Sequence, residues 1–548
     1  PEVAEPERTI AVETSQWVAV FSTRGAAPTS WRLLKGPDNR PIRAADGSEL
    51  ELIPAVALQP IGPPLRVAVP GDDTATARLS QATYSATVRA GDAAAQPAGE
   101  RLAVGDGETV ELAFQTPDPA TNQIVTKRFI FTGGQYDFRV ALESSAGPRP
   151  FGLVVGPRVG DQSVRAEGTY THTPPFAVAT TAAGSTTYIY GGDVTEGQQK
   201  AVEGFSRWVG VTDNYFAMVA ATPNNQAQAV VANAKLKFEE SEETPHDFLS
   251  VVIPVEPGRP AHVFVGPKDQ DLLDAVSLRA TETVAAPVDY SPLINYGFFS
   301  WLVKPIIPII NFALQATNKL TGNYGWSIII VTTLFNLLFF PLRYKSSVAM
   351  KRAAKLQPRM KELQEKLKKF KPTDPQFKEI QSEQMALMRE GNPLGGCLPM
   401  LVQFPFFWAF FVYLTTTFLV RQQPWVGWVQ DLTAPDPYYI LPVVMCAAQI
   451  GATILMPMPQ TDDPAMKMQR TLMIWVMPVF ITYFFLVAAP SGLVLYWLTL
   501  NVVGIGMQYA INRMLPPDVK EPVSGGKGSK KDKEPKKPSP TELVGSGK

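Results

Sequence analysis

The sequence predicts a multi-domain membrane protein in which a large all-β domain precedes a five-helix transmembrane core with a cytoplasmic helical hairpin. The 548 residues contain 50 basic and 50 acidic side chains, yet these are distributed unevenly. Residues 1–342 carry 35 acidic and 25 basic residues, a net charge of −10, and residues 343–548 carry +10. The second part also contains long segments without any charged residue. A soluble enzyme is excluded, and the two parts are expected to face different surroundings.

Residues 1–285, called the β-domain below, are rich in Gly, Pro, Thr and Val. Segments such as 123–131 and 136–142 alternate apolar and polar residues, and Gly133-Gly134 separates them as a turn. Many such strands predict a large antiparallel sandwich, and residues 268–279 form the clearest helical interruption. The chain has two cysteines, both in predicted spans, and three histidines, all in the β-domain. We therefore expect no disulfide framework, no metal site and no cofactor.

Residues 286–323 predict an interfacial or coupling helix between the two parts. Aromatic side chains open this segment, and an uncharged stretch bounded by Lys304 and Lys319 follows them. The stretch is too short to cross a membrane, which favours a helix that lies along the membrane surface. The alternative is a buried linker helix of the β-domain.

Four uncharged segments in residues 319–513 predict the transmembrane core, residues 324–514. About 20 helical residues cross the roughly 30 Å hydrocarbon layer. Three of the segments fit one crossing each, and the fourth fits two crossings that fold back at 489–492, where Pro and Gly break the helix. The predicted spans are 324–342, 397–420, 437–456, 471–488 and 492–511.

The charge of the loops predicts the orientation of the chain. Residues 343–390 hold 13 basic and six acidic residues, so the positive-inside rule places this loop in the cytoplasm. Apolar residues from Ala349 to Phe370 follow a heptad spacing, which makes segment 343–391 a basic helical hairpin. Alternation across five spans then puts the β-domain outside.

The two ends of the sequence bear on export and on possible partners. An exported domain needs a signal, yet the sequence begins Pro1-Glu2-Val3 without an apolar segment. We expect either a removed signal peptide or an N-terminal signal-anchor helix outside the given sequence. Residues 515–548 are rich in Lys, Pro, Gly and Ser and predict a disordered basic cytoplasmic tail. This tail is either a solvated orientation signal or an arm for ribosomal RNA or anionic lipid.

Uncharged polar residues within the spans are the candidate functional residues. In hydrocarbon such groups need partners or water, so they indicate either interhelical hydrogen bonds or a polar cavity in the bundle. No catalytic motif accompanies them, and no span contains Asp or Glu, which weighs against an intramembrane protease. An alternative is a polytopic transporter or channel with a periplasmic sensor domain. The candidates are Thr332, Asn336, Gln403, Tyr496, Trp497, Asn501 and Gln508.

Three segments of the core resemble the YidC/Oxa/Alb family of membrane protein insertases. They are NPLGGCLPMLVQFPFF at 392–407, DLTAPDPYYILP at 431–442 and PSGLVLYW at 490–497. In addition, FVGPKDQDLL at 264–273 is similar to the end of the periplasmic domain of Gram-negative members. The resemblance covers about 290–514 and implies a periplasmic β-supersandwich followed by a five-helix insertase core.

The resemblance also implies a function without covalent chemistry. Family members insert nascent inner-membrane proteins and help them fold, alone or with the Sec translocon, through a hydrophilic groove that opens to the cytoplasm and the lipid. Applied here, it implies nascent membrane proteins, the Sec translocon, the lipid bilayer and the ribosome as partners, the last through the basic hairpin and tail. It implies no small-molecule substrate, and a multi-pass location in the bacterial inner membrane with residues 1–285 in the periplasm.

One position departs from the family pattern. Bacterial members commonly carry a groove arginine six residues before the Leu of a Pro-Leu pair, and Asn336 occupies that position here. We therefore expect a groove that uses neutral hydrogen bonds, with basic residues at its cytoplasmic mouth that attract acidic substrate tails. These basic residues are Arg343, Lys345, Lys351 and Arg352.

Overall fold

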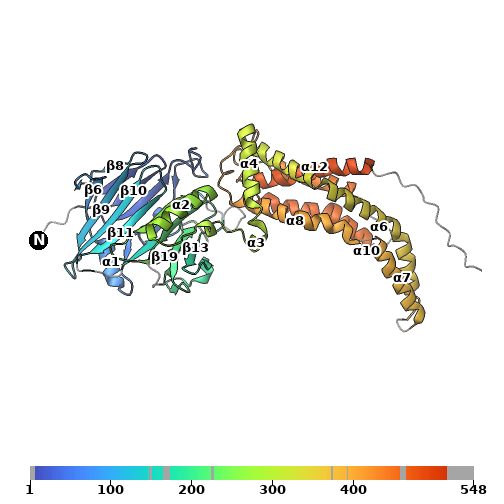
Figure 1. Cartoon of the computed structure of the whole chain (residues 1–548), viewed down its shortest axis with the longest axis horizontal. Coiled ribbons are helices and arrows are strands. Elements are labelled where there is room, and N and C mark those ends of the chain that lie inside the picture. The colour runs from blue at the N-terminus through green and yellow to red at the C-terminus, as the bar shows by residue number, and fades with distance from the viewer. Residues whose placement is uncertain are drawn as a thin grey trace, which may run out of the picture.

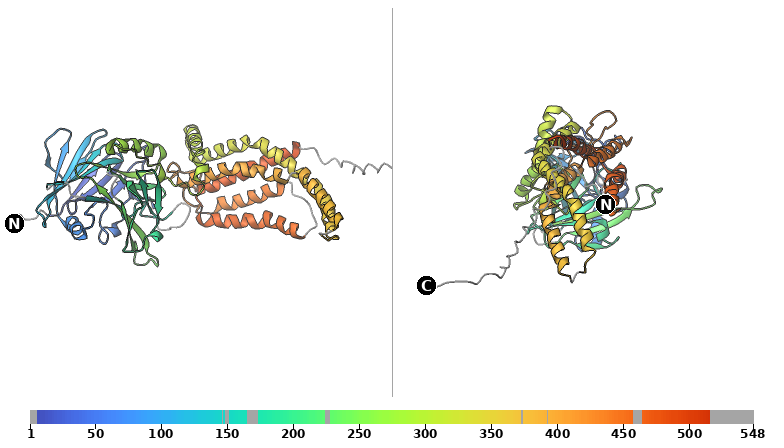
Figure 2. Two further views of the ribbon diagram at one scale, coloured as in Figure 1. Left: turned by 60° about the horizontal axis from the view of Figure 1, so that its bottom comes forward. Right: turned by 90° about the vertical axis from the view of Figure 1, so that its right-hand side faces the viewer.

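The protein is elongated, with the β-domain at one end and the helices at the other (Figures 1 and 2). Its architecture is taken from a computed structural model. The described residues are 6–145, 147, 151–164, 173–223, 228–371, 374–391, 393–456 and 464–514.

Among its described residues, the β-domain contains three sheets. A ten-stranded sheet has the order β14-β13-β16-β17-β20-β11-β10-β9-β6-β7, and two five-stranded sheets have the orders β4-β3-β2-β1-β8 and β15-β18-β19-β12-β5. All named strand pairs are antiparallel except β1 with β8. The predicted β-rich domain is thus confirmed. The strands are β1 (Thr9–Glu13), β2 (Trp17–Ser22), β3 (Ala27–Leu33), β4 (Leu50–Glu51), β5 (Val67–Ala68), β6 (Ser85–Ala90), β7 (Gln96–Pro97), β8 (Arg101–Ala103), β9 (Thr109–Pro117), β10 (Ile124–Thr132), β11 (Asp137–Ser144), β12 (Phe151–Val155), β13 (Phe176–Thr181), β14 (Thr186–Ile189), β15 (Gln199–Ala201), β16 (Ser206–Thr212), β17 (Phe216–Ala221), β18 (Val230–Leu236), β19 (His246–Val255) and β20 (Ala261–Pro267).

Aromatic side chains fill the space between the first small sheet and the large one. The rings of Trp17 and Trp31 stack at 4.7 Å, and Phe21 meets Phe129 edge-on at 4.9 Å. The alternation along β10 places Phe129 on the buried face of its strand. Sheet-on-sheet packing of this kind buries the large apolar area that holds a sandwich together.

Two α-helices are present among the described residues of the β-domain. The predicted interruption is α2 (Gln270–Val284), whose first turn is capped because the carboxylate of Asp269 accepts a hydrogen bond from the Leu272 amide at 3.1 Å. Helix α1 (Asp73–Gln81) was not predicted. It buries only Ala75 and Leu79, so its apolar periodicity is too short to stand out in the sequence.

A buried polar network ties α2 to the large sheet. The carboxylate of Asp137 on β11 accepts hydrogen bonds from Arg279 Nε at 2.9 Å and Nη2 at 2.5 Å. His262 Nε2 on β20 lies 3.0 Å from the same carboxylate, and His262 Nδ1 lies 3.2 Å from the hydroxyl of Tyr290. One carboxylate therefore joins two strands and a helix, and His262 extends the network to the segment that leads to the membrane part.

Short helices connect the β-domain to the long ones: α3 (Ser300–Val303) and α4 (Ile307–Thr321). Helix α4 lies across the ends of the long helices (Figure 1) and packs against α5 and α8. It buries Ile310 and Leu314 but exposes Phe312 and Leu320. An apolar helix face without a partner in the protein is typical of a helix at a membrane surface.

The remaining helices run side by side along the long axis, and α6 and α7 extend beyond them, away from the β-domain (Figure 2). Helix α12 packs against α5, α8 and α9, and α9 packs against α11. A five-residue π-helical segment, Leu472–Val476, precedes α11. The helices are α5 (Tyr324–Leu338), α6 (Phe340–Leu367), α7 (Pro375–Gly391), α8 (Pro393–Thr416), α9 (Ile440–Leu455), α10 (Pro464–Thr471), α11 (Met477–Ala488) and α12 (Ser491–Met514).

By length and apolar composition, one helix of the described residues, Ser491–Met514, is long enough to cross a membrane, or two if a bent pair counts as one span. The bent pair is α5 and the first part of α6, which meet at 55°. Pro341 in the first turn of α6 explains the break, because proline has no amide hydrogen for the preceding helix. Leu401–Thr416 and Ile440–Leu455 are shorter apolar helices.

Helices α6 and α7 pack against each other at the far end of the molecule. Leu363 on α6 and Leu387 on α7 are buried, and Arg359 forms an ion pair with Glu383 across the two helices at 3.1 Å. Helix α6 continues through Pro358 as one element. Buried leucines at this seam give the hairpin a packed interior of its own.

Candidate substrate groove

Helix α12 carries four of the seven uncharged candidate residues and lies at the centre of the bundle. Its first turns hold Tyr496 and Trp497, and both side chains belong to an aromatic cluster. The ring of Tyr496 stacks on Phe410 of α8 at 4.8 Å, and Trp497 meets Phe407 edge-on at 5.0 Å. Trp497 also meets Phe485 of α11 at 4.9 Å. Through these ring contacts, the cluster packs α8, α11 and α12 against one another.

Thr332 and Asn336 lie on the buried face of α5, which packs against α12. The side-chain amide of Asn336 donates to the carbonyl of Thr332 at 2.8 Å. The sequence placed these two residues one turn apart, and the hydrogen bond joins them along the helix. The bond leaves the Asn336 carbonyl oxygen and one amide hydrogen for another partner.

Five buried polar atoms of the bundle have no hydrogen-bond partner among the residues that the structure describes. They come from five different helices: α5, α8, α9, α11 and α12. A polar atom that is buried in hydrocarbon without a partner costs several kcal/mol, so these atoms favour a space that admits water or polar substrate groups. The atoms are Thr332 Oγ1, Trp408 Nε1, Gln449 Oε1, Thr482 Oγ1 and Asn501 Nδ2.

Farther along α12, away from the β-domain, Gln508 is the centre of a chain of polar contacts. Its carbonyl oxygen accepts from the hydroxyl of Ser347 on α6 at 3.4 Å. Its amide donates to Asn512 at 3.1 Å, and the Asn512 amide donates to the carbonyl of Leu455 on α9 at 3.2 Å. Gln508 is thus a paired residue that holds α6, α9 and α12 together.

Arg343 lies against α12 between Asn501 and Gln508. A methyl group on Gly504 would lie 3.2 Å from both terminal guanidinium nitrogens of Arg343. Glycine at this position therefore leaves the room that the guanidinium occupies. Because 501, 504 and 508 are three and four residues apart, they share one face of α12. The bend before α6 thus brings a positive charge to the polar face of α12.

The other predicted residues are more exposed. Gln403 on α8 and Lys351 on α6 are half-buried, whereas Lys345 and Arg352 on α6 are exposed. The structure therefore places Arg343 at the bundle and leaves the other basic residues along the outside of α6.

Gln449 and Thr482 are two further polar residues that the sequence analysis did not select. Both lie inside uncharged segments that it had identified as spans. Their polarity among apolar neighbours was the available signal. Among the described residues, no group of three or more His, Cys, Asp or Glu side chains is arranged to hold a metal ion.

Comparisons with known proteins point to the same family for both parts of the chain. The family model described as YidC periplasmic domain matches residues 72–309, and the one described as 60Kd inner membrane protein matches residues 316–518. Membrane protein insertase YidC of Geotalea daltonii is 30% identical over 534 residues, which cover 94% of this chain and 88% of that protein. The YidC of Aromatoleum aromaticum is 31% identical over 77% of this chain and 73% of its own length.

Solved structures resemble the chain only distantly. A putative aldose 1-epimerase from Escherichia coli K12 covers 48% of this chain and 100% of its own, at 10% identity and a TM-score of 0.28. The assignment therefore depends on sequence relatives that span nearly the full chain and on the two family models. The chain belongs to the YidC family of membrane protein insertases.

Proposed function

We propose that this protein inserts nascent inner-membrane proteins into the bilayer and helps them fold, without catalytic chemistry. The observation that carries the proposal is the set of unpartnered buried polar atoms on five packed helices, together with Arg343, which lies against the face of α12 that carries Asn501. Its family membership favours this function over a transporter or channel with a sensor domain.

The mechanism that we propose follows from the cost of moving polar groups through hydrocarbon. Polar flanks of a nascent segment enter the groove and hydrogen-bond with Thr332, Asn336 and Asn501, which shortens their path through lipid. The apolar part of the segment partitions into lipid at the wall of the groove, and this transfer drives insertion. Arg343 at the mouth attracts acidic tails.

The membrane topology that we propose has five spans formed by α5, α8, α9, α11 with its π-helical segment, and α12. The β-domain lies in the periplasm, α4 lies on the periplasmic surface of the inner membrane, and the α6–α7 hairpin lies in the cytoplasm. The basic charge of the hairpin supports this orientation. Its exposed Lys and Arg residues fit the ribosome as a partner, and the Sec translocon is a further proposed partner. The tail, residues 515–548, lies outside the described residues.

Site-specific crosslinking tests the groove directly. A photoreactive amino acid at Thr332, Gln403 or Trp497 is expected to crosslink a stalled nascent membrane protein in each case. The matched control is Leu334, which lies on α5 like Thr332. Its side chain is 58% exposed and faces away from the bundle. Crosslinks of all three groove positions to lipid alone would overturn the insertase groove.

Substitution of Asn336 tests the polarity of the groove. We expect Asn336→Leu to slow insertion of a client with a polar translocated tail about 10-fold, because a hydrogen-bonding group worth about 1–2 kcal/mol is lost. Asn336→Arg should be tolerated. Insertion is measured by protease protection of the client, and function is measured by growth after depletion of the resident insertase. Thr333→Leu, a half-buried position beside it, is the control, and full activity of Asn336→Leu would contradict the prediction.

A further inference from the structure

The loop between α8 and α9, residues 417–439, is a compact unit that is held by its own carboxylates. The carboxylate of Asp431 accepts hydrogen bonds from the backbone amides of Gln422 and Thr433 at 2.9 and 2.8 Å. The carboxylate of Asp436 accepts from the Trp428 indole at 2.9 Å and from the Leu441 amide at 2.7 Å. Buried charges with several donors hold a loop in one conformation.

This α8–α9 loop covers the end of the bundle that faces the β-domain. On α5, the side-chain amide of Asn323 donates to the Trp425 carbonyl at 3.0 Å. A methyl group on Gly325 would lie 2.3 Å from the Trp425 ring, so the indole rests directly on the backbone of α5. On α12, the Gly492 amide donates to the Leu432 carbonyl at 2.8 Å. The loop thus bridges the first turns of the two helices that carry the polar groove.

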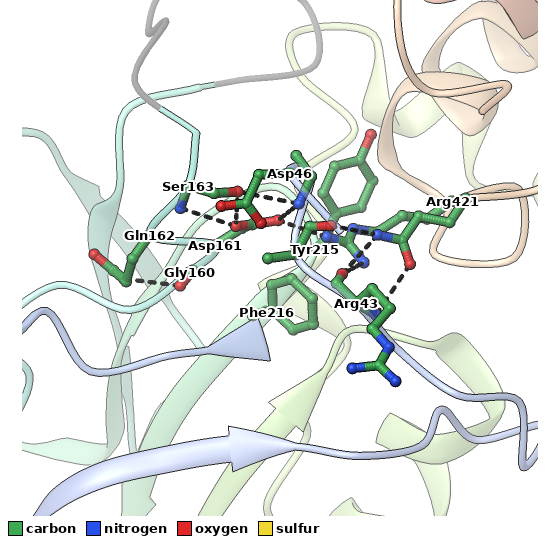
Figure 3. A network of polar contacts seen from close by, with 12 residues as sticks. Arg43, Asp46, Gly160, Asp161, Gln162, Ser163, Tyr215, Phe216 and Arg421 are labelled. Carbon is green, nitrogen blue, oxygen red and sulfur yellow. Dashed lines mark hydrogen bonds and ion pairs between the residues drawn. The ribbon is translucent and has the colours of Figure 1, made fainter. Parts of the chain in front are cut away.

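The β-domain holds this loop through a buried ion pair (Figure 3). Arg421 Nη2 lies 2.7 Å from Asp161 Oδ2, and both side chains are 6% exposed. Arg421 Nη1 also donates to the Arg43 carbonyl at 3.0 Å. The guanidinium carbon lies 5.2 Å from the centre of the Phe216 ring and 5.9 Å from that of Tyr215. The loop arginine is therefore enclosed by β-domain groups.

Neighbouring contacts extend the same interface. The Gln422 side chain donates to the carbonyls of Arg43 and Ala44 at 2.6 and 3.1 Å and accepts from the Arg43 amide at 3.1 Å. Phe418 meets Phe216 edge-on at 5.9 Å. These contacts are neutral, and the Arg40 guanidinium adds a long contact to the Leu419 carbonyl at 3.5 Å. Among the described residues, Arg421–Asp161 is the ion pair that joins the loop to the β-domain.

We infer that Asp161 and Arg421 are positioning residues of the insertase: they fix the α8–α9 loop from the β-domain so that it closes the outer end of the groove. The inference rests on the proposed function, because the outer side is defined by the proposed topology. A closed outer end keeps water and ions from crossing the membrane through a groove that is open to the cytoplasm. The β-domain thereby acts on the membrane core through the loop that it holds.

The ion pair makes a specific prediction about single and double substitutions. Arg421→Met leaves the buried Asp161 carboxylate with hydrogen bonds from Ala45 and Ser163 but without its charged partner. Asp161→Asn likewise leaves the buried Arg421 guanidinium with the Arg43 carbonyl but without a carboxylate. Removing one partner of a buried pair is strongly destabilising, whereas removing both charges costs much less. Each single variant should therefore release the loop, and the double variant should restore it in part.

The test measures the access of water to a residue beneath the loop. Ser327 on α5 is 0% exposed, so Ser327→Cys, with the two native cysteines replaced by serine, reports opening of the outer end. Spheroplasts are labelled with a membrane-impermeant maleimide. We expect about 100-fold faster labelling in Asp161→Asn and in Arg421→Met, and a rate near that of the parent in the double variant.

Three controls separate the possible causes. Ser206→Cys, in the core of the β-domain and 1% exposed, reports whether that domain stays folded. Leu278→Cys, 69% exposed on α2, reports that the β-domain is outside. Glu203→Gln removes an exposed charge from the same domain and should leave all rates unchanged.

The outcomes discriminate between this inference and the proposed function. Faster labelling of Ser327→Cys while Ser206→Cys stays protected supports the positioning role. Unchanged labelling in both single variants overturns it, and so does an equal rise at Ser206→Cys, because the pair would then only stabilise the β-domain. Failure to label Leu278→Cys would instead overturn the proposed topology.

Discussion

Asp137→Ala is expected to destabilise the β-domain by about 3–5 kcal/mol, because it leaves the buried His262 and the partly buried Arg279 without their shared acceptor. Arg279 and His262 both contact this carboxylate, and its side chain is 4% exposed. Hydrogen exchange of the β11 and β20 amides in the detergent-purified chain measures the effect. Asp92→Ala, an exposed carboxylate of the same domain, should leave exchange unchanged. Equal exchange in the two variants would contradict the prediction.

The same carboxylate gives the β-domain a pH dependence. Burial alone raises the pKa of Asp137, but the hydrogen bonds and charges of His262 and Arg279 outweigh it, so the pKa lies below the ordinary value of 3.8. A carboxyl group whose pKa is lowered by folding stabilises the folded state above its unfolded pKa. This stabilisation is lost as the pH falls through the folded value. The difference in stability between the parent and Asp137→Ala should therefore shrink below about pH 4.

The all-β character of the first domain could be predicted from local alternation, as β10 illustrates. Every second residue of that strand is buried, which is the pattern that the sequence displays. One of these positions, Lys127, is an exception that alternation alone misreads. It is fully buried, and its ammonium group donates to the carbonyls of Ala26 and Leu65. Those partners are distant in sequence, as are the strands that pair in each sheet, so neither could be predicted locally.

The helices of the second part could be predicted because the absence of charge over long segments is a local property. Thr332 and Asn336 were selected on the same grounds, since helical periodicity alone places them on one face. The position of Arg343 could not be predicted in this way. It depends on the bend at Phe339 and on a glycine of α12 more than 150 residues later. Contact between distant segments requires the packed structure.

The final prediction concerns the close contact between the Arg343 guanidinium and Gly504. Gly504→Leu puts a side chain where the guanidinium now lies, because even a single methyl group would lie 3.2 Å from its nitrogens. Overpacking of this kind costs about 1–3 kcal/mol and moves the more flexible partner, here the arginine. Insertion of a client with an acidic tail should then fall about 5-fold to 150-fold, the equivalent of that energy. A client with a neutral tail should be affected much less, since only the acidic tail requires the charge.

Gly506 provides the matched control, since it lies two residues later on α12 and a methyl group there would meet no atom within 4 Å. Gly506→Leu makes the same chemical change on the same helix without touching Arg343, so it should insert both clients normally. Arg343→Gln should reproduce the loss for the acidic client, and adding Gly504→Leu to it should bring no further loss. If Gly504→Leu affected both clients equally, its cost would come from helix packing alone. A loss confined to the acidic tail would instead assign the attraction of substrate to one arginine, held on a face of α12 that has no room for a side chain at position 504.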